Sequence, residues 1–422
     1  RQAIEKMRRQ KRRRSRRSKF SRMPYSHVYS ALRPFHDRIL SGTWNQNIAY
    51  SRAGVLLAFA AEVQYFVVAE PEGTDRPAIE TMLADIPVPD NTPVDGFPDT
   101  HINLIMVLSE SFWDPTQLEN VAFSEDPVPT VHRIEKEFGS LQCIAPVFGG
   151  GTCDSELEML TGCSMVFFPP DTAPYKYYIR KPLPSIATIL RNRGYRTVSI
   201  AGSFESYFND HQVYPRLGFD EFISAEEWTI ENITVREWYI DDEATIRQII
   251  DTAERLGRKK RPYFINVNTM ENHWPYPPER YAGLDYPIKD CIKTDVLDER
   301  LQRMLQTFTI GMKRSDQALG ALIAHFRKAD DPTMIVFYGD HLPGLGMDGN
   351  YDEIFRKCGF FPAHADDPAS KKQFLLRKYS TKAYFWNNFG YRLVLPKQPV
   401  SMNYFPSVLL PNLGITPPPF FL

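Results

Sequence analysis

Thr152 is the residue with the most direct chemical potential, because three consecutive glycines, 149–151, stand immediately before it. Glycines let a backbone approach a ligand closely, and the unpaired N–H groups at the start of a helix attract anions. Apolar residues at Leu157 and Leu160 predict that a helix begins here. The Thr152 hydroxyl would then lie where a phosphate or sulfate binds, and it would be a nucleophile once its pKa is lowered. The structural alternative is an ordinary threonine N-cap.

Three apolar segments are each followed by residues that can bind a metal or move a proton. These residues are Glu110, His273, Asp340 and His341. Taken singly, each has a structural alternative as a helix cap, a turn residue or part of a solvated loop. Together with Thr152, the carboxylates of Glu110 and Asp340 and the imidazole of His341 make an oxygen-rich set of metal donors with one nitrogen. Such a set suits Mn²⁺ best, with Mg²⁺ and Zn²⁺ as alternatives. Asp114 is an alternative to Glu110 as the metal ligand, and we prefer Glu110 because it lies nearer the end of the strand.

The elements that must position these residues are expected to be strands that alternate with helices. Continuous apolar runs predict buried strands, and longer mixed segments between them predict helices. This alternation predicts an α/β fold with a largely parallel central sheet flanked by helices, in which ligands gather beyond the carboxyl ends of the strands. The expected strands are 101–108, 197–201, 263–267 and 333–338, and the expected helices are 183–192, 244–256 and 301–327.

Charge divides the chain unevenly although its formal net charge is −1. Residues 1–22 carry 12 Lys and Arg against one acid, and the remaining 400 carry 38 Lys and Arg against 50 Asp and Glu. A basic leader on an acidic body fits a disordered arm, a nucleic-acid patch or a segment beside anionic lipid. We expect no nucleic-acid partner, because the acidic body offers no basic stripe with interleaved aromatic residues. The five cysteines form no CxxC pair, so a thiolate zinc site is not expected.

We predict two parts in the chain. Residues 1–95 form a basic juxtamembrane arm, a helical segment and a linker rich in Pro and Asp, and residues 96–422 form the catalytic domain. The most apolar segment, 53–69, contains Glu62 and Gln64, so it is expected to be an interfacial or packed helix rather than a membrane span.

Five ordered motifs then resemble one family. They are SESF at 109–112, GTCDSE at 151–156, NDHQVY at 209–214, NHWP at 272–275 and GDH at 339–341. Their order is similar to that in lipoteichoic acid synthase-like phosphoglycerol transferases, of the sulfatase-like branch of the alkaline phosphatase superfamily. The resemblance runs from about residue 101 to residue 415. It implies an alkaline phosphatase-like fold with an N-terminal helical juxtamembrane segment.

By position, the resemblance places the metal ligands at Glu110, Thr152, Asp340 and His341, with Thr152 also the nucleophile. It implies a catalytic or phosphate-binding role for His273. Asn209, His211 and Trp274 are further candidates for substrate contact. One position departs from the family pattern, since Asp210 stands where an arginine would grip the phosphate. We hypothesise that His211 supplies the missing positive charge.

The implied function is metal-dependent transfer of phosphoglycerol from a membrane phospholipid, phosphatidylglycerol, to an extracytoplasmic polymer or glycan through a phosphothreonine intermediate. The alternatives are phosphoethanolamine transfer and hydrolysis of a sulfate ester or phosphodiester by an enzyme of the same superfamily. Cys153 is followed by Asp, Ser and Glu, so the C/S-x-P-x-R signal for formylglycine is absent. A non-catalytic binding relative is a further alternative, although all four expected metal ligands are present.

The resemblance also implies a location. Members of the family carry transmembrane helices before an extracytoplasmic catalytic domain, so we expect such helices to precede this chain and its catalytic domain to act at the outer face of the cell membrane. Basic flanks usually stay cytoplasmic. Either the arm is cytosolic and 53–69 crosses the membrane, or the arm binds outer-leaflet phosphates, which we prefer.

Overall fold

The computed structural model describes residues 101–421 apart from 169–171, 232, 237–238, 285–290, 348 and 363–365, together with 50–51, 54–56, 58, 75–84 and 97. The sheet and the candidate site belong to a compact unit formed by residues 86–167 and 173–422. A second unit, 1–85 with 168–172, includes the exposed helix α4 (Arg76–Ala84). The basic arm and most of the segment 53–69 lie outside the described residues. Within the described part, no helix combines the length and apolarity needed for a membrane span.

An eight-stranded sheet forms the centre of the larger unit, in the order β12-β3-β11-β10-β1-β8-β4-β5. The five strands from β10 to β5 are parallel to one another, and β11 runs antiparallel to both of its neighbours. The strands are β1 (Asn103–Ser109), β3 (Ser140–Ile144), β4 (Arg196–Ala201), β5 (Glu221–Ile223), β8 (Tyr263–Asn268), β10 (Thr333–Gly339), β11 (Ser380–Asn387) and β12 (Val400–Ser401). The predicted α/β fold with a largely parallel sheet is therefore confirmed.

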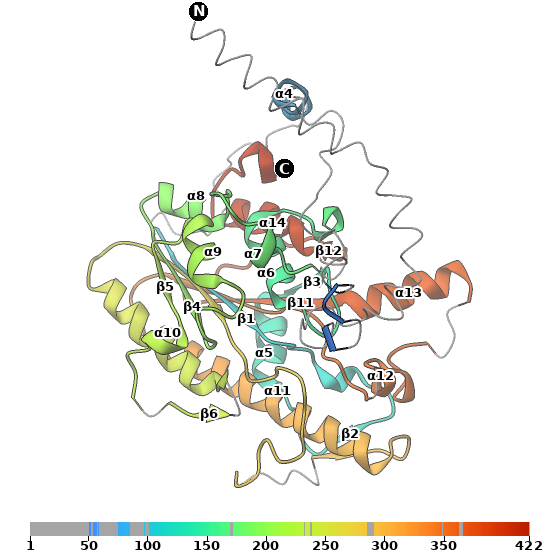
Figure 1. Ribbon diagram of the computed structural model, residues 1–422. Helices are drawn as coiled ribbons and strands as arrows, with labels where there is room; N and C mark the ends of the chain where they lie inside the picture. Colours follow the sequence, from blue (N-terminus) through green and yellow to red (C-terminus); the bar gives the residue numbers. More distant parts are fainter. Residues whose placement is uncertain are drawn as a thin grey trace, which may run out of the picture. The chain divides into compact units, whose positions relative to one another are not determined.

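Helices cover both faces of the sheet (Figure 1). One face carries α5 (Pro129–Phe138), α10 (Asp242–Gly257) and α11 (Glu299–Phe326), and the other carries α6 (Thr152–Thr161), α8 (Ile186–Asn192), α9 (Asp210–Arg216) and α14 (Phe405–Asn412). The remaining helices include α7 (Pro174–Tyr177), α12 (Glu353–Lys357) and α13 (Pro368–Tyr379). Two small antiparallel strand pairs lie outside the central sheet. In one, β2 (Ala122–Phe123) pairs with β9 (Ile292–Lys293), and in the other, β6 (Val235–Arg236) pairs with β7 (Tyr239–Ile240).

The register of the central strands decides where the site forms. Every residue of β1 and β10 is buried, as expected for strands covered on both faces. Ser109 pairs with Gly339, and Leu108 pairs with both Tyr338 and Asn268. The carboxyl ends of β1, β10 and β8 therefore coincide, and the residues that follow these three strands emerge together.

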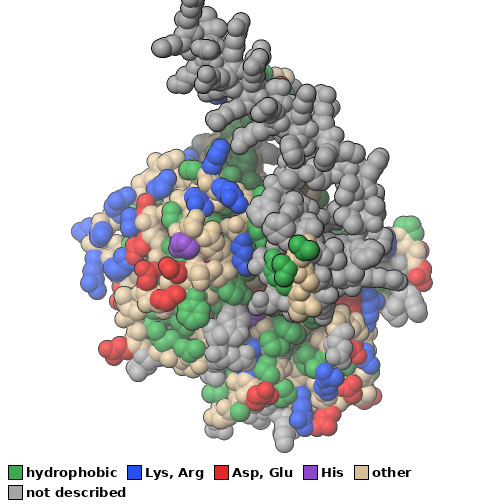
Figure 2. Space-filling view, in the orientation of Figure 1, with side chains coloured by type: hydrophobic (Ala, Val, Ile, Leu, Met, Phe, Trp, Pro, Cys, Tyr) green, Lys and Arg blue, Asp and Glu red, His purple; other side chains and the backbone are tan. Residues whose placement is uncertain are grey.

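A group of basic side chains lies at the other end of the strands. Figure 2 shows Lys and Arg gathered along one edge of the face drawn, beside α10. The exposed residues Arg258, Lys259 and Lys260 follow α10, close in sequence to the start of β8. Because strand starts and strand ends lie on opposite edges of a parallel sheet, this basic group is remote from the site described below.

The segment after β1 is fixed by a histidine between two carboxylates. His132 of α5 contacts Asp114 Oδ2 through Nε2 at 3.1 Å and Asp126 Oδ2 through Nδ1 at 2.8 Å. The hydrogen bond to Asp114 raises the pKa of His132 to about 9, although burial acts in the opposite direction. Asp114 also caps a short 3₁₀ helix by accepting from Thr116. This carboxylate is therefore occupied in structural contacts.

This arrangement predicts a pH-dependent contribution to stability. The pKa of His132 is higher in the folded chain than its ordinary value of 6.5, so the contribution is fully present below pH 6.5 and is lost as the pH rises through about 9. We expect a loss of about 1 kcal/mol, because a partly exposed pair is screened by solvent. Urea unfolding of wild type and His132→Gln at pH 6 and pH 9.5 measures the difference, with His325→Gln as the control. Equal pH dependence in wild type and His132→Gln would contradict this assignment.

Candidate metal centre and nucleophile

The paired ends of β1 and β10 bring Glu110 and Asp340 next to each other. Glu110 follows the last residue of β1, and Asp340 follows Gly339, the last residue of β10. A Cβ on Gly339 would lie 2.1 Å from the carbonyl oxygen of Phe112, so only glycine allows the turn after β1 to cross this strand so closely. Glycine at this position is thus a condition for the two carboxylates to meet.

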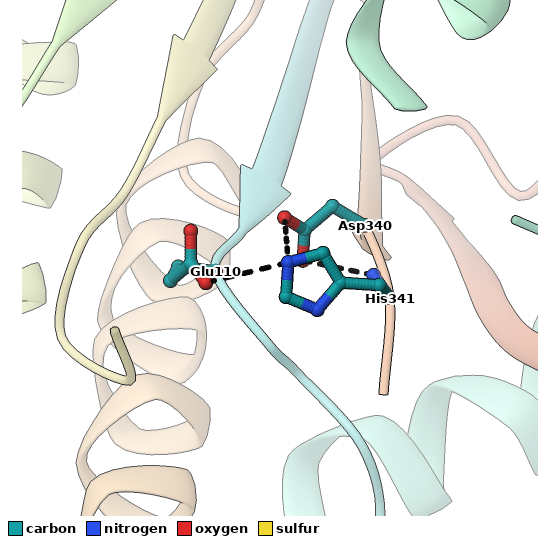
Figure 3. A group of neighbouring side chains, drawn as sticks. All are labelled: Glu110, Asp340 and His341. Carbon is teal, nitrogen blue, oxygen red and sulfur yellow. Dashed lines mark hydrogen bonds and ion pairs between the residues drawn. The ribbon is translucent and has the colours of Figure 1, made fainter. Parts of the chain in front are cut away.

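Glu110, Asp340 and His341 form one compact buried cluster (Figure 3). One possible ligand atom from each of the three lies within 4.8 Å of the others. His341 Nε2 is 3.2 Å from Asp340 Oδ2 and 3.7 Å from Glu110 Oε1. All three side chains are at most 3 % exposed, so their charges interact in a medium that screens them weakly.

The hydrogen bonds of His341 fix its tautomer. Its Nδ1 is 2.9 Å from the carbonyl oxygen of Leu342, which can only accept, so Nδ1 carries the proton. In the neutral ring Nε2 then has a free lone pair, and this atom faces the two carboxylates. A backbone carbonyl that orients the second nitrogen in this way is typical of histidines that bind metals.

Thr152 completes the cluster from α6. Its Oγ1 donates to Glu110 Oε2 at 2.8 Å. The three preceding glycines have φ of +72°, +150° and +96°, so the loop uses conformations that side chains disfavour. The loop and the first turn of α6 are tied to the segment that follows β10, because Gly149 N–H donates to the Leu342 carbonyl at 3.0 Å and Ser155 Oγ donates to the Asp340 carbonyl at 2.7 Å. Gly151 is the N-cap and Thr152 makes no capping bond, so the N-cap alternative for Thr152 does not apply.

The cluster fits a divalent cation on its own chemistry. Asp340 Oδ2 and His341 Nε2 are buried and have no hydrogen-bond partner among the described residues. Burial and the charge of Glu110 raise the pKa of Asp340 to about 7. For Glu110, burial acts to raise the pKa, but the charges of His273 and His341 lower it overall. A cation among these atoms would satisfy the orphaned groups and offset the repulsion, and carboxylate and hydroxyl oxygens with one imidazole suit Mn²⁺, Mg²⁺ or Zn²⁺.

Sequence analysis missed Ser111, which joins the two carboxylates. Its Oγ donates to Glu110 Oε1 and its backbone N–H donates to Asp340 Oδ1, both at 2.8 Å. Its φ is +51°, a left-handed conformation that is uncommon for a side-chain-bearing residue and is found at functional sites. The only sequence signal was the serine beside Glu110.

His273 lies beyond the end of β8, on the same edge as the cluster. Its Nδ1 is 2.6 Å from the Trp274 carbonyl, so this nitrogen carries a proton, and its Nε2 is 3.3 Å from the Tyr207 hydroxyl. Its charge is among the causes that lower the pKa of Glu110. His273 is therefore available to move a proton at Nε2.

A buried network behind His273 holds its loop. Arg314 of α11 contacts Glu271 Oε1 at 2.9 Å and Asp241 Oδ2 at 3.1 Å. Asn272 Nδ2 donates to Ser315 Oγ at 2.8 Å, also on α11. The loop that carries His273 is thus anchored to α10 and α11 rather than to the sheet alone.

The other sequence candidates lie around this centre with different contacts. Asn209 is the N-cap of α9 with φ +68°, and Asp210 is buried with its pKa raised well above the ordinary value by burial and by the charge of Glu156. His211 is exposed and contacts the Glu205 carbonyl and the Gln212 side chain, both outside the cluster. Trp274 is 36 % exposed. Asp114, the competitor of Glu110, contacts His132 instead of the cluster.

Arg314 is expected to be a strong stabilising residue. Arg314→Met leaves Glu271 and Asp241 buried without their cation, and breaking a buried ion pair this way costs about 3 kcal/mol. Arg303→Met, on the same helix, removes only the exposed pair with Glu299 and should cost less than about 1 kcal/mol. Urea denaturation gives both free energies, and similar values for the two variants would contradict the proposed anchor.

Comparisons with known proteins agree with this fold. Residues 102–385 match the family described as Sulfatase. The chain is 32 % identical over 352 residues to a protein of Rhizobium meliloti (strain 1021) named "Putative cyclic beta-1,2-glucan modification protein", covering 83 % of this chain and 51 % of that protein. It is 25 % identical over 211 residues to Lipoteichoic acid synthase 1 of Bacillus subtilis (strain 168), covering 49 % of this chain and 30 % of that protein. The chain therefore spans about half or less of the length of these relatives.

A solved structure shares the architecture. The Streptococcus pyogenes phosphoglycerol transferase GacH, in complex with sn-glycerol-1-phosphate, aligns with a TM-score of 0.61 and 22 % identity, covering 76 % of each chain. With the family match over residues 102–385, this likeness confirms the resemblance stated from the motifs. The chain belongs to the Sulfatase family and has the α/β fold of the alkaline phosphatase superfamily.

Proposed function

We propose that this chain transfers phosphoglycerol from a membrane phospholipid, phosphatidylglycerol, to a glycan of the cell envelope, with Thr152 as the nucleophile. The observation that carries the proposal is the contact of the Thr152 hydroxyl with Glu110, beside the unpartnered Asp340 Oδ2 and His341 Nε2. A hydroxyl at the start of a helix, within a group of cation ligands, is suited to attack phosphorus.

The residues proposed to hold the cation are Glu110, Thr152, Asp340 and His341, and Mn²⁺ is the ion we favour. A divalent cation bound there would lower the pKa of the threonine hydroxyl and neutralise charge on the phosphoryl oxygens. Phosphoryl transfer needs little other covalent assistance, so positioning and electrostatics supply most of the acceleration.

In the first step Thr152 Oγ1 attacks phosphorus and the bond from phosphorus to the diacylglycerol oxygen breaks. The hydroxyl proton leaves toward Glu110 Oε2, the acceptor of its hydrogen bond. His273, protonated at Nε2, gives a proton to the departing diacylglycerol oxygen. The phosphoglycerol group is then esterified to Thr152.

In the second step a hydroxyl of the acceptor attacks the same phosphorus and the bond from phosphorus to Thr152 Oγ1 breaks. His273 Nε2, left neutral by the first step, takes the proton of the acceptor hydroxyl, and the proton held by Glu110 returns to Thr152. Both side chains then regain their starting protonation states. The fixed Nδ1 bond of His273 to the Trp274 carbonyl keeps Nε2 as the exchanging atom.

The names of the relatives support the choice of group and acceptor. One solved relative is a phosphoglycerol transferase, and the Rhizobium meliloti relative is named for glucan modification. A glucan hydroxyl is therefore the acceptor we favour over a glycerophosphate polymer. Phosphoethanolamine transfer and hydrolysis of a phosphodiester or sulfate ester use the same cluster and remain the alternatives, because Asp210 stands where an arginine was expected and is buried.

We also propose the placement of the chain in the cell. The catalytic unit, residues 96–422, acts at the outer face of the cell membrane, and residues 1–95 lie next to the membrane. The donor is an anionic phospholipid, and a basic arm beside its headgroups would be attracted by their charge.

The cation is expected to stabilise the folded chain measurably. At a free Mn²⁺ concentration of 100 times its Kd, binding adds about 2.7 kcal/mol to the free energy of unfolding. Glu110→Gln removes one charged ligand and should lose most of this gain, whereas Glu243→Gln, at an exposed position of α10, should keep it. Thermal melts with Mn²⁺ and with EDTA measure the effect, and an undiminished Mn²⁺ shift in Glu110→Gln would disprove the ligand assignment.

Thr152 is tested by trapping the intermediate. Incubation with phosphatidylglycerol vesicles and Mn²⁺ should release diacylglycerol and give a glycerophosphate adduct on the peptide that contains Thr152, seen by mass spectrometry. Thr152→Ala should lose at least about 100-fold in rate while keeping its fold, and Thr152→Ser, which retains a hydroxyl, should keep part of the activity.

Vesicles of phosphatidylethanolamine and an aryl sulfate serve as the competing substrates. If the chain turns over either of these substrates faster than phosphatidylglycerol, the corresponding alternative function is correct and phosphoglycerol transfer is not. Release of diacylglycerol by Thr152→Ala at the wild-type rate would show that Thr152 is not the nucleophile.

A further inference from the structure

A cavity of about 890 Å³ opens beside the candidate site and has no role in the chemistry described so far. Its walls come from three segments: the loop after His273, the start of α11 and the loop after His341. Residues that line it include Trp274, Pro277, Asp298, Arg303, Met347 and Tyr351. A cavity of this size suits a ligand of several sugar rings rather than a single ion.

Gly344 links the cavity wall to the nucleophile loop. A Cβ placed on Gly344 would lie 3.3 Å from the Tyr351 ring and 3.7 Å from the Trp274 ring, and a Cβ on Gly149 would lie 3.6 Å from Gly344 Cα. Gly344 therefore stands between the loop that ends at Thr152 and the two aromatic rings. A ligand that packs against these rings therefore lies near the loop that carries the reacting hydroxyl of Thr152.

Two partly exposed aromatic rings shape the wall of the cavity. Trp274 is 36 % exposed and Tyr351 is 42 % exposed, and their ring centroids are 6.1 Å apart at an interplanar angle of 88°. The C–H face of a pyranose ring packs well against an aromatic face, and its hydroxyls reach polar groups at the rim. The two rings thus offer an apolar surface of the kind on which carbohydrate rings pack.

The charged residues of the wall give the cavity no net positive charge with which to attract a polyanion. Asp298 caps α11 by accepting from Leu301 N–H at 2.9 Å, and Glu299 occupies the first turn of that helix. These carboxylates already neutralise the helix start, which would otherwise attract phosphate. Glu299 also pairs with Arg303, so the two acidic and two basic residues of the wall balance.

We propose that this cavity is the acceptor subsite and that it binds a neutral glucan, with Trp274 and Tyr351 as the stacking surface. The proposal rests on the proposed function, since it gives the acceptor of that transfer a place. It also predicts discrimination: a neutral glucan binds, and a glycerophosphate chain, which carries a negative charge on each unit, does not.

The test measures binding without chemistry. The full 422-residue chain with Thr152→Ala is titrated with neutral cyclic β-1,2-glucan and with a glycerophosphate oligomer by calorimetry. The glucan should bind, and Tyr351→Ala in this background should weaken it roughly tenfold through loss of one stacking ring. Trp274→Ala should weaken it similarly. Tyr404→Ala removes another exposed tyrosine, one that does not line the cavity; it is the matched control and should bind as the parent does.

Two results would overturn the proposal: unchanged glucan affinity in both aromatic variants, with circular dichroism showing that they fold, or tighter binding of the glycerophosphate oligomer. Absence of glucan binding to the parent chain would overturn it as well. These outcomes are separable from failure of the proposed function. A chain that binds glucan through these rings but forms no adduct on Thr152 would retain the subsite and lose the transfer mechanism.

Discussion

The parallel pairing of β1 with β10 is the constraint on which the rest of the structure depends. Ser109 stands opposite Gly339. The residues that follow them, Glu110 and Asp340, therefore place their carboxylates within 4.8 Å of each other. The arrangement requires glycine at 339, because the carbonyl of Phe112 occupies the space that a side chain would take. A slip of one residue in this register would separate Glu110 from Asp340 and turn every side chain of the slipped strand to the opposite face of the sheet.

Burying two carboxylates and an imidazole together is unfavourable for folding, and the chain offsets it only in part. Ser111 donates to both carboxylates and Thr152 donates to Glu110, yet Asp340 Oδ2 and His341 Nε2 keep no hydrogen-bond partner within the described structure. Ser111 also holds a left-handed backbone conformation. Local destabilisation of this kind is common at functional sites, where the surrounding core maintains it. Here the surrounding core is the central strands, the anchored glycine loop and the ion network around Arg314.

Much of the fold could be predicted because the central strands are continuous apolar runs, and the candidate site follows from their carboxyl ends. Strands β3, β5, β11 and β12 escaped prediction because they are short, lie near the sheet edges or mix polar with apolar residues, so periodicity did not mark them. Ser111 and Arg314 were missed for a different reason. Their roles depend on a backbone angle and on contacts between distant segments, which no local pattern encodes. The aromatic cavity likewise exists only because three segments distant in sequence meet, the loop after His273, the start of α11 and the loop after His341.

Anomalous diffraction from crystals grown with Mn²⁺ is the sharpest test of the proposed cation site, since it locates the ion without reference to activity. We expect one strong peak at the ends of β1 and β10, at about 2.0–2.3 Å from Glu110, Asp340, His341 Nε2 and Thr152 Oγ1. A peak elsewhere on the molecule, or an ion at this position with Thr152 Oγ1 turned away from it, would show that these four residues do not form the cation site.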